Sequence, residues 1–170
     1  MKIGTIEKIF DFLKANEGKE LPREWVRLIK KTKLIKELEN HPDGEQYRNE
    51  GDLNLNFSKI TKLPNNLYVD GNLDLFDCKQ LTELPIKLYV DGDLDLGNLN
   101  ITKLPYKLHV EGSLNLTGCS ELTEIPNNLY VGRSLFIDKT PLAKKYTNEQ
   151  IREIVTSTGG QITGKISRNL

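Results

Sequence analysis

Side chains that could carry out catalysis or bind a metal are few in this chain. Histidine occurs only at His41 and His109, and cysteine only at Cys78 and Cys119. None of these residues forms a His-x-x-x-His or Cys-x-x-Cys pair, the spacings that place two metal ligands side by side. We therefore expect no metal site, no cofactor and no enzymatic activity. A catalytic site assembled in space would need a pocket that contains His109.

A glycine-rich stretch, GGQITGK at residues 159–165, comes close to the phosphate-binding loop of nucleotide-binding proteins. That loop needs Ser or Thr after its lysine to hold Mg²⁺, and here the next residue is Ile166. It also follows a strand and opens a helix. The pattern here predicts the reverse order, with a helix over 148–156 and strand-like alternation over 161–167. We therefore do not expect this segment to bind a nucleotide.

Tyrosine and acidic residues recur at regular intervals through the middle of the chain, and they are the candidates for binding. One column comprises Tyr68, Tyr89, His109 and Tyr130, with Asp70, Asp91 and Glu111 beside it. A second comprises Asn54, Asp74, Asp95, Asn115 and Phe136, with Asp52, Asn72, Asp93 and Ser113 beside it. A third comprises Asn56, Phe76, Gly97, Thr117 and Asp138.

Two interpretations of these columns are open. Exposed tyrosines beside acids suit a protein interface, because tyrosine supplies contact area at a low cost in side-chain entropy. Alternatively, aromatic columns only stabilise neighbouring strands and polar columns keep a sheet soluble. Calcium binding is not expected, because the Gly-Gly-x-Gly-x-Asp repeats of calcium-binding solenoids are absent. On the first interpretation the partner-binding residues are Tyr68, Asp70, Asp74, Phe76, Tyr89, Asp91, Asp93, Asp95, His109, Glu111, Tyr130 and Phe136.

The columns arise because one sequence motif, referred to below as the phrase, is repeated four times in the chain. The copies begin at Gly51, Gly71, Gly92 and Gly112, and a partial fifth begins at Arg133. The phrase therefore recurs with a nearly constant period of about 20 residues, which is typical of a solenoid. In such a fold the stacked units share one core.

Each copy shows the alternation of a half-buried strand. The apolar side of one copy comprises Leu67, Val69, Gly71, Leu73 and Leu75. The glycine lies on this inward side, where a Cβ would crowd a bend between two short strand segments. A proline in every return segment, such as Pro64, prevents a helix there. Because Arg133 replaces the glycine in the fifth copy, we expect the solenoid to loosen or end at that point.

The motif Leu-x-Leu-x-x-Cys-x-x-Leu-Thr-x-Leu-Pro resembles the leucine-rich repeat, in particular the short Leu-Pro type of bacterial effectors, and short bacteriophage repeat proteins look similar. The resemblance implies an α+β fold, a leucine-rich-repeat solenoid of four β-rich repeats plus a partial fifth. It also implies that Cys78 and Cys119 point inward. These cysteines are two repeats apart, about 10 Å, which is too far for a disulfide. A flatter β-solenoid is the alternative, because the segment before the glycine is a second alternating strand.

Both ends of the chain differ from the repeats. We divide the chain into an N-terminal helical cap (1–45), the leucine-rich-repeat solenoid (46–142) and a C-terminal helix-strand cap (143–170). Two amphipathic helices are expected near the start. The first, over 3–15, has an apolar face of Ile6, Ile9, Phe10 and Leu13. The second, over 21–38, has an apolar face of Trp25, Leu28, Ile29, Thr32, Ile35 and Leu38, and its basic residues are Arg23, Arg27, Lys30, Lys31, Lys33 and Lys36.

The net charge is zero, but its distribution is uneven. Residues 1–40 carry three more basic than acidic residues, and residues 51–139 carry four more acidic than basic ones. An acidic repeat surface attracts a basic partner. No apolar run reaches the about 18 residues of a membrane span, and the acids near the start do not suit a secretory signal. We therefore expect a cytoplasmic location.

The leading hypothesis is a non-enzymatic scaffold for protein–protein interaction. The resemblance to phage repeat proteins, together with a Lys- and Asn-rich composition, implies an accessory protein in the bacterial host cytoplasm. Such a protein would bind and inhibit a host factor, for example a defence or CRISPR effector. The alternative hypothesis is that the basic N-terminal helices bind nucleic acid or an acidic partner. In that case the solenoid is a spacer or a self-association platform.

Overall fold

The structure is a computed structural model that describes residues 8, 11–12, 14–15 and 20–169. The chain divides into two compact units, Met1–Leu38 and Glu39–Leu170. The main element near the start is α2 (Arg23–Glu39), so the helix predicted over 21–38 is present. Its Trp25 ring packs edge-on against Phe12, with 5.2 Å between the ring centroids. The apolar face predicted for the first helix lies outside the described residues; it comprises Ile6, Ile9, Phe10 and Leu13.

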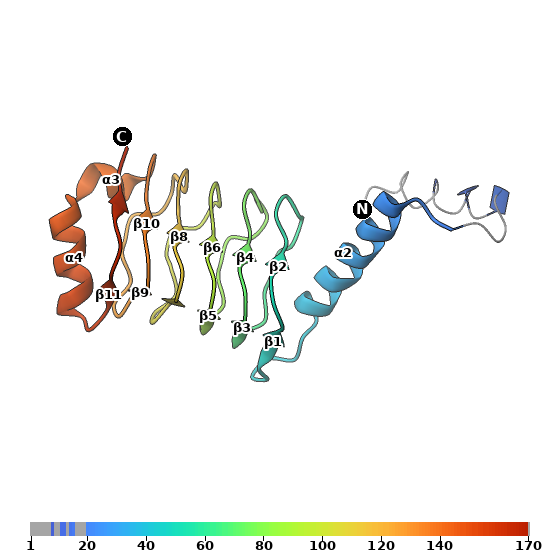
Figure 1. Cartoon of the computed structure of the whole chain (residues 1–170), viewed down its shortest axis with the longest axis horizontal. Coiled ribbons are helices and arrows are strands. Elements are labelled where there is room, and N and C mark those ends of the chain that lie inside the picture. Colours follow the sequence, from blue (N-terminus) through green and yellow to red (C-terminus); the bar gives the residue numbers. More distant parts are fainter. Residues whose placement is uncertain (1–7, 9–10, 13, 16–19, 170) are drawn as a thin grey trace. The chain divides into compact units, whose positions relative to one another are not determined.

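The second unit is a β-solenoid in which strands one repeat apart pair in parallel (Figure 1). Its strands form two six-stranded sheets, and one strand of each sheet, joined by a bend, makes up a rung. Sheet A contains β1 (Tyr47–Asn49), β3 (Leu67–Val69), β5 (Leu88–Val90), β7 (His109–Val110), β9 (Tyr130–Val131) and β11 (Gln161–Ile162). Sheet B contains β2 (Leu53–Asn54), β4 (Leu73–Asp74), β6 (Leu94–Asp95), β8 (Leu114–Asn115), β10 (Leu135–Phe136) and β12 (Ile166–Ser167). The predicted solenoid is confirmed, and each of its strands is very short.

The core lies inside the coil and is built from the inward column of every rung. In the second rung Leu67, Val69, Leu73 and Leu75 are at most 1% exposed, and the equivalent residues of the other repeats are buried in the same way. Because the pairing is parallel and in register, each leucine lies against the leucine of the next rung. Stacking of these columns buries an apolar surface that a single repeat could not bury alone.

The bend between the two strands of a rung depends on a glycine and on a polar side chain from the preceding rung. The Oδ1 atom of Asp52 accepts a hydrogen bond from the Asn72 N–H at 2.7 Å, and Asn72 Oδ1 accepts from the Asp93 N–H at the same distance. A Cβ on Gly71 or Gly92 would overlap these oxygens and the backbone behind them. Glycine is therefore required so that the polar side chain can reach the next bend.

The solenoid does not loosen at Arg133, so that expectation was wrong. The Arg133 N–H donates to the Gly112 carbonyl at 3.0 Å, and β9 and β10 pair with β11 and β12 beyond it. The backbone accepts arginine at this point because Arg133 does not need a positive φ, and its N–H makes the same bond to the preceding bend that Gly92 and Gly112 make.

Between the fifth and sixth rungs the chain forms α3 (Pro141–Lys145) and α4 (Asn148–Ser157). A reciprocal pair of hydrogen bonds between Thr147 and Gln150 caps the start of α4. None of the helices in the described part of the chain is long and apolar enough to cross a bilayer.

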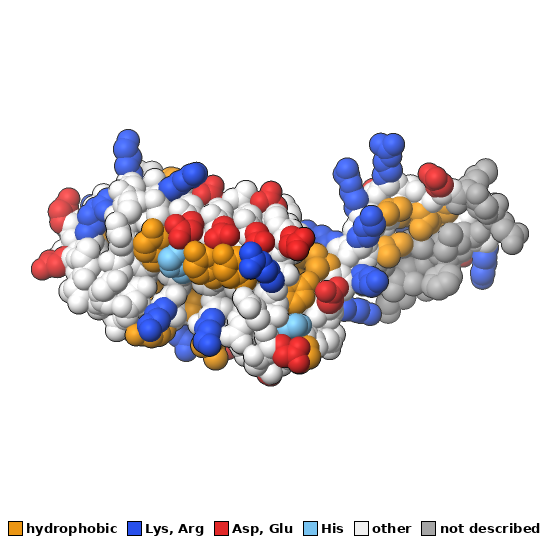
Figure 2. Space-filling model, turned by 60° about the horizontal axis from the view of Figure 1, so that its bottom comes forward, with side chains coloured by type: hydrophobic (Ala, Val, Ile, Leu, Met, Phe, Trp, Pro, Cys, Tyr) orange, Lys and Arg blue, Asp and Glu red, His pale blue; other side chains and the backbone are white. Residues whose placement is uncertain are grey.

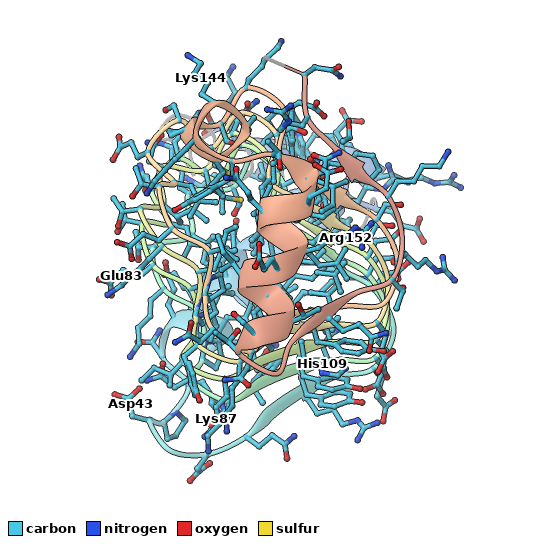
Figure 3. All side chains as sticks on the ribbon, turned by 90° about the vertical axis from the view of Figure 1, so that its left-hand side faces the viewer. Asp43, Glu83, Lys87, His109, Lys144 and Arg152 are labelled. Carbon is cyan, nitrogen blue, oxygen red and sulfur yellow. The ribbon has the colours of Figure 1, made fainter. Side chains whose placement is uncertain are left out.

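The chain then returns as β11 and β12, so the strand predicted over 161–167 is two strands separated by a bend. Residues 159–165 run from α4 into β11, and the order strand, loop, helix of a phosphate-binding loop is not present there. Arg152 of α4 donates hydrogen bonds to the carbonyl oxygens of Ile162 and Gly164 (Figure 3). These bonds occupy acceptors at the edge of the sheet, where an open edge would invite another chain to pair.

Candidate functional site

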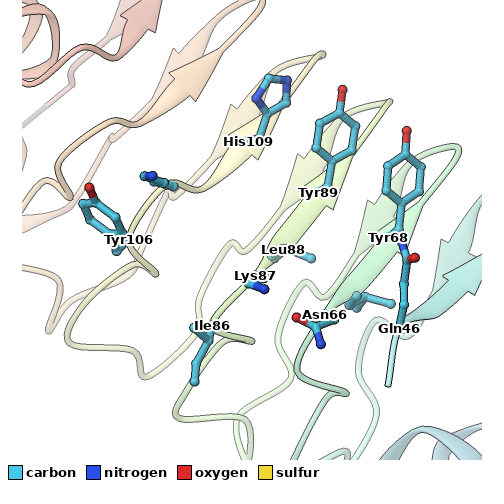
Figure 4. A pocket seen from close by; sticks show the side chains of 11 residues that line it. Gln46, Asn66, Tyr68, Ile86, Lys87, Leu88, Tyr89, Tyr106 and His109 are labelled. Atoms are coloured by element: carbon cyan, nitrogen blue, oxygen red, sulfur yellow. The ribbon is translucent and has the colours of Figure 1, made fainter. Parts of the chain in front are cut away.

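The outward face of sheet A carries a continuous stack of aromatic rings. Parallel pairing places equivalent residues in register, and the stack comprises Tyr68, Tyr89, His109 and Tyr130. We call these four residues the aromatic ladder. Successive ring centroids are 4.6, 4.3 and 4.2 Å apart and the planes differ by 8–10°. Because each inner ring has a neighbour on both faces, the ladder presents ring edges and polar atoms to a partner (Figure 4).

Acidic residues form a second column beside the ladder, two residues further along each rung. This acidic column comprises Asp70, Asp91 and Glu111. The Tyr68 hydroxyl donates to Asp91, and the Tyr89 hydroxyl donates to Glu111, at 3.1 Å. His109 Nε2 lies 2.8 Å from the same Glu111 oxygen. The predicted proximity of tyrosines and acids is therefore present in the structure, and hydrogen bonds link Asp91 and Glu111 to the ring one rung earlier.

These contacts shift the pKa values of the groups involved. The hydrogen bond with His109 lowers the pKa of Glu111, and the bond from Tyr89 acts in the same direction. Partial burial raises the pKa of Tyr89 to about 12, and the hydrogen bond to Glu111 adds to the effect. Partial burial and the bond to Asp91 likewise raise the pKa of Tyr68. At neutral pH the phenols are therefore neutral donors and Glu111 is ionised.

Arg48 closes the ladder at the first rung. It pairs in register with Tyr68, and its guanidinium carbon lies 4.6 Å from the centre of the Tyr68 ring. Its Nε atom is 2.9 Å from Asp70 Oδ1. Sequence reasoning missed this residue, although the signal was present: Arg48 precedes Gly51 by three residues, as Tyr68 precedes Gly71. Arg48 shows how a cation is bound on this surface, with a ring face below it and a carboxylate beside it.

A groove of about 610 Å³ runs along the other side of the ladder (Figure 4). Its lining residues are Gln46, Asn66, Leu67, Tyr68, Ile86, Lys87, Leu88, Tyr89, Tyr106, Lys107 and His109. Ile86 and Tyr106 are 69% and 58% exposed, which is high for large apolar side chains. The groove does contain His109, but its lining supplies neither Ser nor Cys as a nucleophile. The geometry therefore suits binding of an apolar group better than covalent catalysis.

The candidate residues of sheet B have a different environment. Oδ1 of Asp74 accepts a hydrogen bond from the Phe76 N–H at 3.0 Å, and Oδ1 of Asp95 accepts from the Gly97 N–H at 2.8 Å. Phe76 packs edge-on against Phe57, with 5.3 Å between ring centroids. These aspartates bond the backbone turn that follows each strand of sheet B. Their arrangement supports the structural interpretation of this column.

The twelve predicted residues thus fall into three groups. Sheet A and the start of its bend carry Tyr68, Asp70, Tyr89, Asp91, His109, Glu111 and Tyr130. Sheet B and the turn after it carry Asp74, Phe76, Asp95 and Phe136, of which Phe136 is 36% exposed. Asp93 lies in the bend, where its Oδ1 accepts from the Ser113 N–H at 2.7 Å. The seven residues of the first group, which we call the binding strip, lie together beside the groove.

Both cysteines lie in the core. Cys78 and Cys119 are free and buried, as expected, and their thiols donate to the carbonyl oxygens of Leu55 and Leu96. Burial raises the pKa of Cys119 to about 11, so this thiol stays protonated. In the described ranges, no group of three or more His, Cys, Asp or Glu side chains is placed to hold a metal ion.

Comparisons with protein-family models, with curated proteins and with solved structures returned no match. The resemblance to leucine-rich repeats therefore stays a prediction from the motif.

Proposed function

We propose that this chain is a non-enzymatic binding scaffold and that its binding strip contacts a protein partner with basic side chains. The observation that carries the proposal is the acidic column, which runs beside a rigid aromatic ladder on an exposed face of the solenoid. Figure 2 shows this arrangement as a row of aromatic side chains with acidic side chains along one side.

The ladder suits binding because it is already ordered. Each inner ring is held between two others, so a partner that contacts it does not have to immobilise it. Tyrosine hydroxyls and ring edges also supply mixed polar and apolar contact area, which is typical of residues that dominate protein interfaces.

The acidic column supplies charge complementarity. Asp91 and Glu111 are exposed to solvent, and Glu111 is ionised at neutral pH. Carboxylates in a row attract a basic partner at long range and pair with its lysines or arginines on contact. Arg48 on Tyr68 and Asp70 is an example of such a contact within the chain itself.

The test is differential capture from bacterial lysate with the intact protein. The strip variant combines Asp91→Lys with Glu111→Lys. The control variant combines Glu83→Lys with Glu124→Lys, which makes the same change of charge at exposed positions of the return segments. A protein captured by the wild type and the control, but lost with the strip variant and weakened by salt, supports the proposal. Equal capture by all three proteins overturns it. Inhibition of a bacterial host factor stays a prediction from the resemblance.

A second candidate function is favoured by the surface of α2. Arg23, Arg27, Lys30, Lys33 and Lys36 are exposed on this helix, and Leu28 and Ile29 are each 37% exposed. A basic helix with an accessible apolar stripe suits nucleic acid or an acidic protein. The variant Arg27→Glu with Lys30→Glu is expected to abolish binding of a labelled DNA duplex if α2 is the site. Unchanged binding, or no binding by the wild type, would dismiss this alternative.

A further inference from the structure

We propose that the occupant of the sheet A face is a single amphipathic α-helix of the partner, lying along the aromatic ladder. Its basic flank faces the acidic column, and its acidic flank faces Lys87 and Lys107. This inference rests on the proposed function and specifies the shape and charge of the partner.

The charge on this face is divided by the ladder. The residues two positions before the first three ladder residues lie at the turn that leads into each strand of sheet A, where they line the groove. In the middle rungs these residues are Lys87 and Lys107, both exposed. The face therefore has three columns, basic, aromatic and acidic, and Figure 2 shows blue side chains on one side of the ladder and red ones on the other. A partner of uniform charge would match only one of the two sides.

The dimensions of the face match a helix. Lys87 and Asp91 flank the three residues of β5, and the four residue steps from one to the other span about 13 Å of extended chain. An α-helix with its side chains is about 10–12 Å across, so it can lie on the ladder and reach both charged columns. An extended strand that turns its alternating side chains toward the two charged columns would have none left to contact the rings between them.

The length and the repeat of the face also match. The ring spacings of 4.2–4.6 Å make the ladder about 13 Å long, which corresponds to about nine residues of helix. Residues i and i+3 of a helix are about 4.5 Å apart along its axis, close to the about 4.8 Å between neighbouring rungs. Two basic residues at this spacing can therefore pair with Asp91 and Glu111 at the same time.

The groove supplies the apolar part of the contact. Ile86 and Tyr106 are exposed and directly precede Lys87 and Lys107, so they lie farther from the ladder along each rung (Figure 4), and the groove that they help to line has a volume of about 610 Å³. The apolar stripe of an amphipathic helix recurs at i, i+3, i+4 and i+7. Such a stripe would cover the ring edges and the part of the groove beside them and would remove both from water.

The experiment uses fluorescently labelled helical peptides, each about four helical turns long, and the full-length protein. The mixed-flank peptide has a leucine stripe, lysines along one flank and glutamates along the other; in the both-basic peptide the glutamates are replaced by lysines. A third peptide carries two prolines within the mixed-flank sequence. Binding is measured by fluorescence anisotropy to the wild type, to Lys87→Glu with Lys107→Glu, and to the Asp91→Lys with Glu111→Lys strip variant.

The expected result is a change of preference. Reversing both lysines should shift the ratio of the two dissociation constants toward the both-basic peptide by about tenfold or more, the effect of moving like charges together across an interface. The proline peptide and the strip variant should each lose binding. Far-UV circular dichroism checks that both protein variants are folded.

Three outcomes overturn the inference. They are an unchanged ratio in the Lys87→Glu with Lys107→Glu variant, equal binding of the proline peptide, and no strip-dependent binding of the mixed-flank peptide. None of these outcomes contradicts the proposed function. The proposed function fails only if the wild type, the strip variant and the control variant capture the same proteins from lysate. The two proposals can therefore fail separately.

Discussion

Sheets A and B carry acidic residues in the same rungs, yet the two faces use them differently. Asp91 and Asp95 are four residues apart. Oδ1 of Asp95 accepts hydrogen bonds from the Gly97 N–H and from the Asn115 side chain, so it is tied to the turn of its own chain. The carboxylate of Asp91 accepts only from the Tyr68 hydroxyl among the described hydrogen bonds and is exposed. Identical side chains are thus structural on one face and accessible on the other.

The difference follows from where backbone donors need partners. After each of the first five strands of sheet B the chain turns through a residue with positive φ, such as Asp77 or Asn98. The side chain two residues before the start of that turn accepts its first N–H, as Asn115 does for Thr117. At the bend after sheet A, the equivalent N–H groups are bonded by side chains of the preceding rung. Among the described hydrogen bonds, no backbone N–H donates to a side chain of the acidic column, and Asp91 and Glu111 are exposed to solvent.

The largest loss of stability is expected from a substitution in the bend, because both sheets depend on it. Gly92→Ala would place a Cβ on Asn72 Oδ1 and on the backbone of Gly71. We expect the free energy of unfolding to fall by about 3 kcal/mol, as in other overpacked sites. Urea denaturation measures this loss. The control is Gly44→Ala, a positive-φ position with no atom within 4 Å, where about 1 kcal/mol is expected. Equal losses would refute the role assigned to the bend.

Matched alanine substitutions on the two sheets test whether their aspartates contribute differently to stability. Asp95→Ala should lower the free energy of unfolding by about 1–2 kcal/mol, because it leaves a half-buried N–H without its acceptor. Asp91→Ala should lower it by only a few tenths of a kcal/mol, about the value of an exposed contact. Asp95→Asn keeps an acceptor oxygen and should be close to wild type. Comparable losses for the two alanine variants would mean that the faces do not differ.

A smaller effect is expected from the ladder. Tyr89→Ala removes contacts with the rings of Tyr68 and His109 and should cost about 1 kcal/mol of stability. Tyr89→Phe keeps both contacts and loses only the bond to Glu111, so its stability should stay within a few tenths of a kcal/mol of wild type. Thermal unfolding compares the two variants. A large loss in Tyr89→Phe would show that the hydroxyl, and not the stacking, orders the ladder.

The smallest effects are in the pH dependence. Because the pKa of Glu111 is lowered in the folded state, its contribution is present above the usual value of 4.5 and is lost as the pH falls through the lowered pKa. The stability difference between wild type and Glu111→Gln, measured by urea denaturation across this range, should therefore be constant near neutral pH and disappear in acid.

At the alkaline end the sign is reversed. The pKa of Tyr89 is raised to about 12, so its contribution is present below the ordinary value of 10.0 and is lost as the pH rises through about 12. The difference in tyrosinate absorbance between wild type and Tyr89→Phe should show this late ionisation. Ionisation of Tyr89 at its ordinary pKa would mean that neither the partial burial of this residue nor its bond to Glu111 persists in solution.

Much of the solenoid could be predicted from the repeats. A period of about 20 residues, together with alternation, indicates which residues face inward and which outward columns align. In the first rung the strand before Gly51 was missed, because Arg48 stands where tyrosine or histidine is found in the later copies, although Gly51 marks the same register. The sixth rung was read as one covering strand, because α3 and α4 lie between Arg133 and Gly164 and interrupt the period.

The candidate site was predicted only in part. Equal spacing indicates that Tyr68 and Tyr89 form a column, but it does not distinguish the acids of sheet A from those of sheet B. That distinction depends on which backbone N–H groups lack a partner after the chain has turned. Lys87 and Lys107 were not predicted, because lysine occurs at this position in only two repeats, and Asn66 and Asn128 take its place in the others.

The bend also has a consequence for how such a chain can change in evolution. Asp52, Asn72 and Asp93 each accept a hydrogen bond from the bend of the following rung. Each of these repeats therefore supplies the acceptor that the next repeat needs. Duplication of one whole repeat inserts a rung whose two joints are already correct, whereas an insertion of a single residue between bend and strand reverses inside and outside. The chain can therefore lengthen or shorten by whole repeats, and the reach of its binding strip changes in steps of one rung.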